Sequence, residues 1–161
     1  MTAIEATQWT GCAIFGLAAL ACAVGRSSPY PVPAIANGLF ALECYVGLRH
    51  RLRGLLVPEM GSYYAGRGPV QIALLFLALA ALLLILGAFR RMAKSSGANR
   101  PAGIAGPCTI VTAFLFLVET ISLHSVDHIL YRPLGDVLAI GWLWICLGGL
   151  TVLDAAGDIR R

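Results

Sequence analysis

Charged residues are scarce in this chain. Asp, Glu, Lys and Arg together make up 12% of its 161 residues, whereas hydrophobic residues make up 58%. Soluble globular domains carry about 25% charged residues. So little charge leaves too few polar side chains to cover a surface that faces water. The composition therefore excludes an ordinary soluble domain. It predicts an all-α, polytopic transmembrane helix bundle that forms a single domain over residues 1–161.

The chain also lacks the common catalytic and nucleotide-binding motifs. It contains no P-loop, no GxGxxG, no HExxH and no GxSxG sequence. Its basic residues form short clusters at the ends of apolar runs, which is typical of anchors in the lipid headgroup layer. A nucleic-acid-binding protein would need one continuous basic face. We therefore expect the lipid bilayer as a partner, no nucleic acid and no catalytic residues, and the sequence favours a non-enzymatic role.

Clustered cysteines are missing as well. The five cysteines lie inside apolar runs and form no CxxC pair: Cys12, Cys22, Cys44, Cys108 and Cys146. Disulfide frameworks and thiolate metal sites both need clustered sulfur. We interpret each cysteine as a small buried hydrophobic residue.

Five apolar runs are present instead, separated by segments rich in Gly, Pro or basic residues that predict turns and loops. About 20 apolar residues cross the hydrocarbon core of a bilayer. The predicted spans are residues 9–25, 34–50, 70–89, 104–130 and 137–154. The second run is short and contains Asn37 and Glu43. The alternative is four spans, with this run lying in the membrane interface.

Local signals predict several helix ends and one packing face. Prolines between residues 29 and 33 predict a turn before the second helix. Asp136 is expected to cap the fifth helix. Gly141 and Gly148 lie seven residues apart in that helix and predict a packing groove, and Trp144 is interpreted as a core or lipid-packing residue.

The distribution of basic residues predicts the orientation. With five spans, the side of the N-terminus carries five Lys or Arg residues and the other side carries seven. The positive-inside rule then favours an external N-terminus and a cytoplasmic C-terminus. With four spans the count is six against six, and the rule predicts nothing.

Ionisable residues inside the predicted spans are candidate functional groups, because a charge at the bilayer centre costs about 3 kcal/mol on insertion scales. Glu43 and His50 are seven residues apart, which places them on one face of a continuous helix. Gly47 and Gly54 share that face, where small residues allow close approach of another helix.

A second polar cluster ends the fourth predicted span. Thr120, His124, Asp127 and Tyr131 follow the i, i+4, i+7, i+11 spacing of one helical face. Glu119 points about 100° away from Thr120 and is expected to contact a different neighbour.

Three chemical roles fit these residues beside a structural one. His50 with His124 or His128 could ligate a haem iron from both sides. His124, Asp127 and His128, together with a glutamate, could bind a transition metal. His124 and Asp127 could exchange protons with Glu43 or Glu119. In the structural interpretation, these groups hydrogen-bond to one another at the membrane boundary, so a haem or metal is not required.

Two short motifs resemble a known group of proteins. The stretch from Tyr63 to Gln71, and the sequence from Ser122 to Asp127, are similar to those of an uncharacterised family of small bacterial multi-pass inner-membrane proteins. The resemblance covers about half of the chain. It implies a bacterial inner-membrane location and a multi-span fold, and it implies no activity.

These observations leave three functional hypotheses. The favoured one is a non-catalytic subunit or partner in a larger membrane complex, or a self-associating protein. The alternatives are a haem- or metal-binding redox protein that uses His50, His124 and His128, and a small proton-coupled transporter.

Overall fold

A computed structural model describes residues 2–25, 31–48, 51, 67–95, 103–121 and 124–159 of the chain. These residues form six helices and one short β-hairpin. The helices are α1 (Ala3–Val24), α2 (Pro31–Val46), α4 (Arg67–Ser95), α5 (Ala105–Ile121), α6 (His124–Leu130) and α7 (Ala139–Ile159). The predicted all-α bundle is confirmed.

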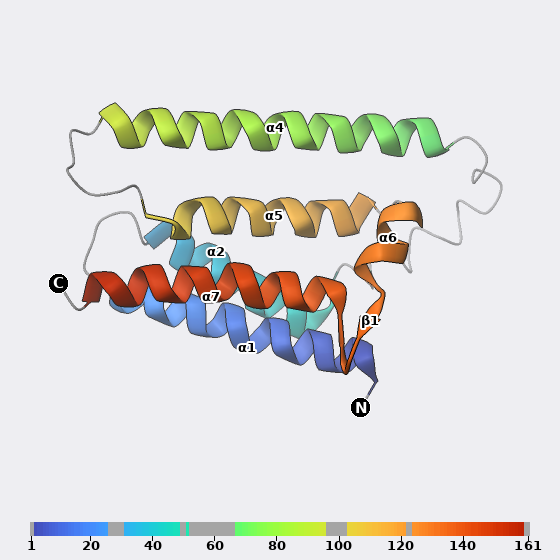
Figure 1. Cartoon of the computed structure of the whole chain (residues 1–161), viewed down its shortest axis with the longest axis horizontal. Coiled ribbons are helices and arrows are strands. Elements are labelled where there is room, and N and C mark those ends of the chain that lie inside the picture. Colours follow the sequence, from blue (N-terminus) through green and yellow to red (C-terminus); the bar gives the residue numbers. More distant parts are fainter. Residues whose placement is uncertain are drawn as a thin grey trace.

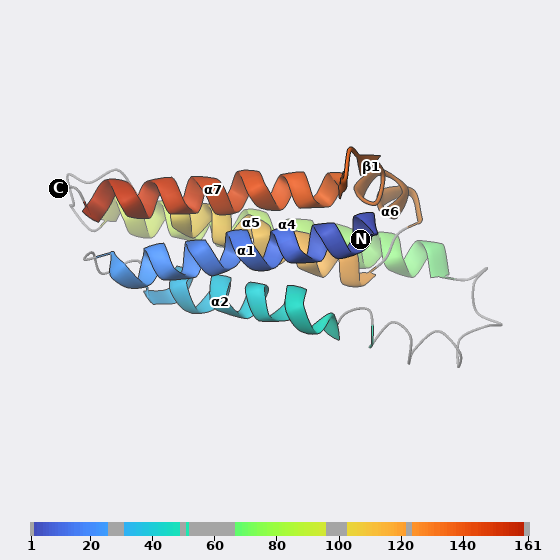
Figure 2. The same ribbon diagram turned by 90° about the horizontal axis from the view of Figure 1, so that it is seen from below.

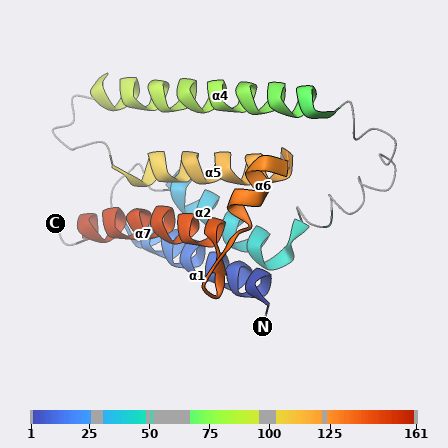
Figure 3. The same ribbon diagram turned by 45° about the vertical axis from the view of Figure 1, so that its right-hand side comes forward.

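The five long helices lie side by side and alternate in direction (Figures 1 and 2). Helix α1 packs against α2 and α7, and α5 packs against α7, α2 and α4. Helix α4 forms an outer layer over α5, as Figure 3 shows. The N-terminus and the C-terminus lie at opposite ends of the bundle (Figure 1). This arrangement is expected of a chain that traverses the bundle an odd number of times.

Three of these helices are long and apolar enough to cross a membrane, over Ala3–Val24, Ile72–Phe89 and Ala139–Gly157. Helices α2 and α5 are also apolar but contain only 16 and 17 residues. At 1.5 Å per residue, α5 is about 25 Å long, slightly shorter than a hydrocarbon core of about 30 Å. The structure therefore has three apolar helices of membrane-spanning length and two shorter apolar helices beside them.

Helix α1 begins six residues before the predicted span, because a capping box starts it. The Thr2 hydroxyl accepts a hydrogen bond from the Glu5 backbone N–H at 3.2 Å, and the Glu5 carboxylate accepts one from the Thr2 N–H at 2.8 Å. This reciprocal pair satisfies two backbone donors that a helix start otherwise leaves without partners.

Helix α2 differs from the prediction at both ends. It begins at Pro31 and includes Pro33, although the prolines predicted a turn. The first turn of a helix tolerates proline because its N–H groups have no intrahelical acceptor. The helix ends at Val46, because Gly47 adopts a left-handed backbone with φ of 64°. Glycine pays no steric cost there and is the usual residue after a helix C-terminus.

The predicted span over residues 104–130 is divided into two helices. Helix α6 turns away from the axis of α5 (Figures 1 and 3). It leads into the antiparallel hairpin of β1 (Pro133–Leu134) and β2 (Val137–Leu138). Gly135, with φ of 72°, and Asp136 form its two-residue turn. The predicted cap at Asp136 is therefore wrong, and α7 begins at Ala139.

Aromatic rings from four helices fill the centre of the bundle. Phe116 of α5 stacks on Trp144 of α7, with ring centroids 5.5 Å apart, and on Phe40 of α2 at 4.9 Å. Phe15 of α1 contacts all three rings and is fully buried. The prediction that Trp144 is a packing residue is confirmed.

The predicted glycine groove is also confirmed. Gly141 and Gly148 of α7 are buried against α1. A Cβ atom on Gly141 would lie 3.0 Å from a methyl group of Thr7, and one on Gly148 would lie 2.6 Å from a side-chain carbon of Ile14. These two positions let α1 and α7 approach closely.

Candidate functional site

The predicted polar cluster is centred on a buried carboxylate. Glu119 lies near the end of α5 and is only 6% exposed. The Tyr131 hydroxyl, just after α6, donates a hydrogen bond to Glu119 Oε1 at 3.2 Å. Tyr131 was predicted on the face of Thr120, and Glu119 was expected to contact a different neighbour. The change of direction between α5 and α6 brings the two residues together instead.

Thr120 does not join this pair. Its side chain is exposed, and its hydroxyl donates to the backbone carbonyl of Phe116 within the same helix at 2.8 Å. A threonine hydroxyl inside a helix often satisfies itself in this way. The single helical face predicted through Thr120, His124, Asp127 and Tyr131 is therefore wrong, because it assumed one continuous helix.

The remaining residues of the predicted cluster are distributed as follows. Asp127 of α6 is half-buried and His128 is exposed. The backbone of His124 begins α6, but its side chain lies outside the described part of the chain, as does the whole of His50. The haem and metal hypotheses that use these histidines therefore stay predictions. Within the described residues, no group of three His, Cys, Asp or Glu side chains could hold a metal ion.

The predicted face through Glu43 and His50 is interrupted. Glu43 is half-buried near the end of α2, and its backbone carbonyl accepts the Gly47 N–H at 2.8 Å. The left-handed conformation of Gly47 ends the helical periodicity that placed His50 seven residues later on the same face. The predicted face assumed that the helix continues past Gly47, where α2 has already ended.

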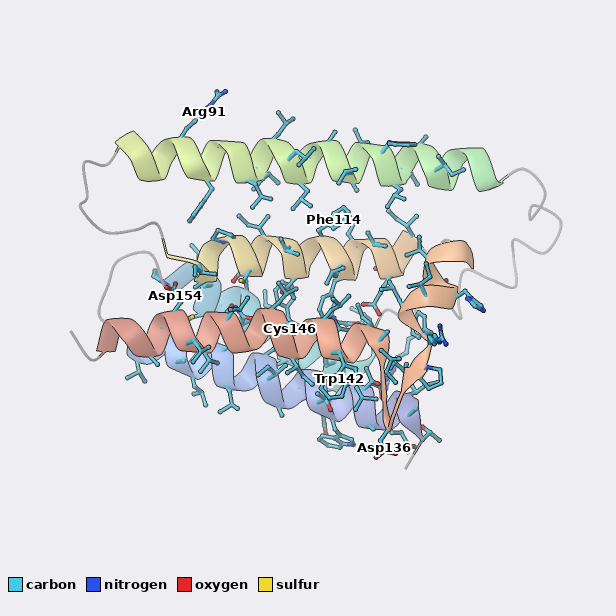
Figure 4. All side chains as sticks on the ribbon, viewed as in Figure 1. Arg91, Phe114, Asp136, Trp142, Cys146 and Asp154 are labelled. Carbon is cyan, nitrogen blue, oxygen red and sulfur yellow. The ribbon has the colours of Figure 1, made fainter. Side chains whose placement is uncertain are left out.

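A second polar region lies at the opposite end of the bundle, where α5 begins. Asp154 of α7 accepts the backbone N–H of Ala105 through its Oδ2 atom at 2.9 Å. Figure 4 shows Asp154 at this end, beside the first turn of α5. A carboxylate at a helix N-terminus satisfies a free backbone donor and complements the helix dipole.

Asn37 and Thr109 connect α2 to α5 near this second region. Asn37 is 1% exposed, and its amide nitrogen donates to Thr109 Oγ1 at 3.2 Å and to the Pro33 carbonyl at 2.8 Å. In the sequence, Asn37 is only a polar interruption of an apolar run. A lone amide in such a run indicates a helix–helix hydrogen bond, although the sequence does not identify its partner.

A third set of polar contacts holds the hairpin of β1 and β2 in place. The backbone N–H of Leu138 donates to the Thr7 hydroxyl of α1 at 2.9 Å, and that hydroxyl donates to the Ala3 carbonyl at 2.7 Å. Trp142 Nε1 donates to the Leu134 carbonyl at 3.1 Å. These bonds hold the segment between α6 and α7 across the end of the bundle.

Hydrogen bonding within the bundle is thus common to the buried Thr, Asn and Glu side chains in the described part of the chain. Each member of this set makes a hydrogen bond to another group of the protein: Thr7, Asn37, Thr109, Thr112, Glu119 and Thr151. Polar groups in an apolar surrounding are stable only when they are paired in this way. Thr112 and Thr151 bond within their own helices. The Asn37–Thr109, Glu119–Tyr131 and Thr7–Leu138 hydrogen bonds join different segments of the chain.

The chain matches no family model, no curated protein and no solved structure.

Proposed function

We propose that this chain is a multi-pass protein of the bacterial inner membrane that serves as a non-catalytic subunit or partner in a larger membrane complex. The proposal rests on the packing and hydrogen bonding of the side chains inside the bundle. Aromatic rings fill the centre of the bundle, and its buried Thr, Asn and Glu side chains hydrogen-bond to other groups of the bundle. Such an interior stabilises the fold of the bundle. The apolar outer surface is then the part of the molecule that can contact lipid or a partner protein.

Helix α4 supplies much of that exterior. Its side chains that point away from α5 are almost all apolar, and Phe76, Leu77, Leu83 and Leu84 are each more than 60% exposed. Phe114 lies between α5 and α4 (Figure 4), on the one side where α4 meets the bundle. Lipid or a partner helix covers the other sides. We propose that the partner contacts α4.

The orientation proposed for the chain has an external N-terminus and a cytoplasmic C-terminus. Helices α4 and α7 finish at the same end of the bundle, and Arg91 of α4 lies at this end in Figure 4. An excess of Lys and Arg near membrane spans favours the cytoplasmic side.

Blue-native electrophoresis after solubilisation in a mild detergent tests the proposal. We expect a species larger than the monomer with its detergent belt, containing a partner protein or further copies of this chain. Leu84→Trp should weaken this assembly, because a larger side chain on the exposed face of α4 obstructs packing. Leu20→Trp on α1 is the matched control, since Leu20 is 65% exposed on another helix. A monomer without any co-purifying protein would overturn the proposal.

A second candidate function is a proton-coupled carrier, favoured by the Glu119–Tyr131 hydrogen bond. A buried carboxyl group and a phenol can exchange a proton along the bond that joins them. In proteoliposomes, Glu119→Gln should abolish a pH-gradient-driven flux while leaving the fold intact. Flux that is unchanged in this variant would exclude Glu119 as the carrier group.

A further inference from the structure

Two thiols from different helices share a pocket on the outer side of α1 and α2. The pocket has a volume of about 100 Å³ and is lined by Gln8, Trp9, Cys12, Cys44 and Tyr45. Cys44 lies so close to α1 that a Cβ atom on Gly11 would be 2.7 Å from its sulfur. Cys12, the next residue of α1, packs in the same cluster as Cys44. The cysteines were predicted to be buried hydrophobic residues. Cys22, Cys44 and Cys108 are buried, but Cys12 is partly exposed and the prediction is wrong for Cys146, which is exposed.

We propose that Cys12 and Cys44 form a binding site for a soft monovalent metal cation of the Cu(I) type. Thiolates are the preferred ligands of such cations. On binding, each thiol releases its proton to water and each sulfur donates an electron pair to the metal, so no group is oxidised or reduced. The amide group of Gln8 can then donate a hydrogen bond to the negatively charged bis-thiolate complex.

The aromatic residues beside the thiols suit the same ligand. Trp9 and Tyr45 meet edge to face, with ring centroids 6.2 Å apart, and both line the pocket. The ring faces can attract the free cation before the thiolates bind it. This environment favours a weakly hydrated soft cation over a hard cation that keeps its water.

The site is also accessible from one end of the bundle. Cys44 lies two residues before the end of α2 at Val46, and Trp9 and Tyr45 are both more than half exposed. Cys12 is partly exposed and Cys44 is 2% exposed, so a cation that arrives at the membrane interface meets Cys12 first and does not have to cross the bundle. Cys146 of α7 is exposed but is not part of the pocket, so it provides an internal control.

Titration of the detergent-solubilised chain with Cu(I), under reducing conditions and in competition with a chromophoric Cu(I) chelator, tests this proposal. We expect stoichiometric removal of Cu(I) from the chelator and a new thiolate-to-copper absorption in the near ultraviolet. Cys12→Ser and Cys44→Ser should each weaken binding at least about tenfold, since one of two ligands is lost. Cys146→Ser should bind as the unmodified chain does. Absence of binding, or binding that persists in the Cys12→Ser/Cys44→Ser double variant, would overturn the proposal.

If a variant fails to fold, alkylation of the unmodified chain tests whether the pocket binds Cu(I). Bound Cu(I) should protect the partly exposed Cys12 from a maleimide, as measured by peptide mass spectrometry, and should leave the exposed Cys146 reactive. Equal labelling of Cys12 with and without Cu(I) would show that the pocket is only a helix contact. The result does not depend on whether the chain has a protein partner.

Discussion

The Asp154 carboxylate of α7 accepts the backbone N–H of Ala105 at 2.9 Å, so one helix of the bundle caps the start of another. The two residues are 49 positions apart in the chain. This contact fixes the axial position of α5 relative to α7. It lies at the end of the bundle opposite the Glu119–Tyr131 pair. It is also the kind of contact that sequence patterns within one helix cannot reveal.

Loss of this cap should destabilise the bundle. We expect Asp154→Ala to lower the free energy of unfolding by about 1 kcal/mol, the usual effect of removing a helix cap. Asp154→Asn keeps an oxygen acceptor and should lose less. Unfolding by SDS titration from dodecyl maltoside micelles measures both. Equal stability of the Ala variant and the unmodified chain would show that the hydrogen bond contributes nothing.

Gly11 of α1 should not tolerate replacement by a residue that has a side chain. A Cβ atom on Gly11 would lie 2.7 Å from both the Cys44 sulfur and the Trp144 ring, and that ring is held by its stacking on Phe116. Gly11→Ala should therefore cost about 1–3 kcal/mol through overpacking. Gly16→Ala, in the same helix, meets no atom within 4 Å and is the control. Because alanine favours the helix, the control should be neutral or stabilising by up to about 1 kcal/mol, and equal destabilisation of the two variants would contradict the packing.

The Glu119–Tyr131 hydrogen bond should appear as a coupling energy. We expect Tyr131→Phe to reduce the free energy of unfolding by about 0.5–1.5 kcal/mol. In the Glu119→Leu background, the same change should have a different effect, because the hydrogen-bond acceptor is gone. A double-mutant cycle measures this difference, expected at about 0.5 kcal/mol or more for groups in contact. Strict additivity would mean that the two side chains do not interact.

The hairpin should depend on Thr7. Thr7→Val has nearly the same shape but removes the acceptor of the buried Leu138 N–H, so it should cost about 1–2 kcal/mol. Amide hydrogen exchange at Leu138 should accelerate in this variant. Thr7→Ser keeps the hydroxyl and should preserve slow exchange. Rapid exchange at Leu138 in the unmodified chain would already rule out the bond.

The helices could be predicted from the sequence because apolar runs of this length have few alternatives to a helix in lipid. The groove through Gly141 and Gly148 followed from their spacing in one uninterrupted helix. Both predictions depend on local composition and on the helical repeat. They do not require knowledge of which helices are neighbours.

The predicted polar faces failed where the helix was not continuous. Gly47 ends α2 before His50, and α6 leaves the axis of α5, so periodicity placed Glu119 and Tyr131 on different faces. The partnerships of Asn37 with Thr109 and of Asp154 with Ala105 arise from contacts between helices. The spacing of residues within one helix does not predict contacts between different helices.

Alkaline carbonate extraction followed by centrifugation, without detergent, tests the membrane account most directly. Carbonate releases soluble and peripheral proteins, whereas a bundle whose outer surface is mostly apolar should remain in the sedimented membranes and dissolve only in detergent. We expect to recover the chain in the pellet. A folded chain in the supernatant would contradict it.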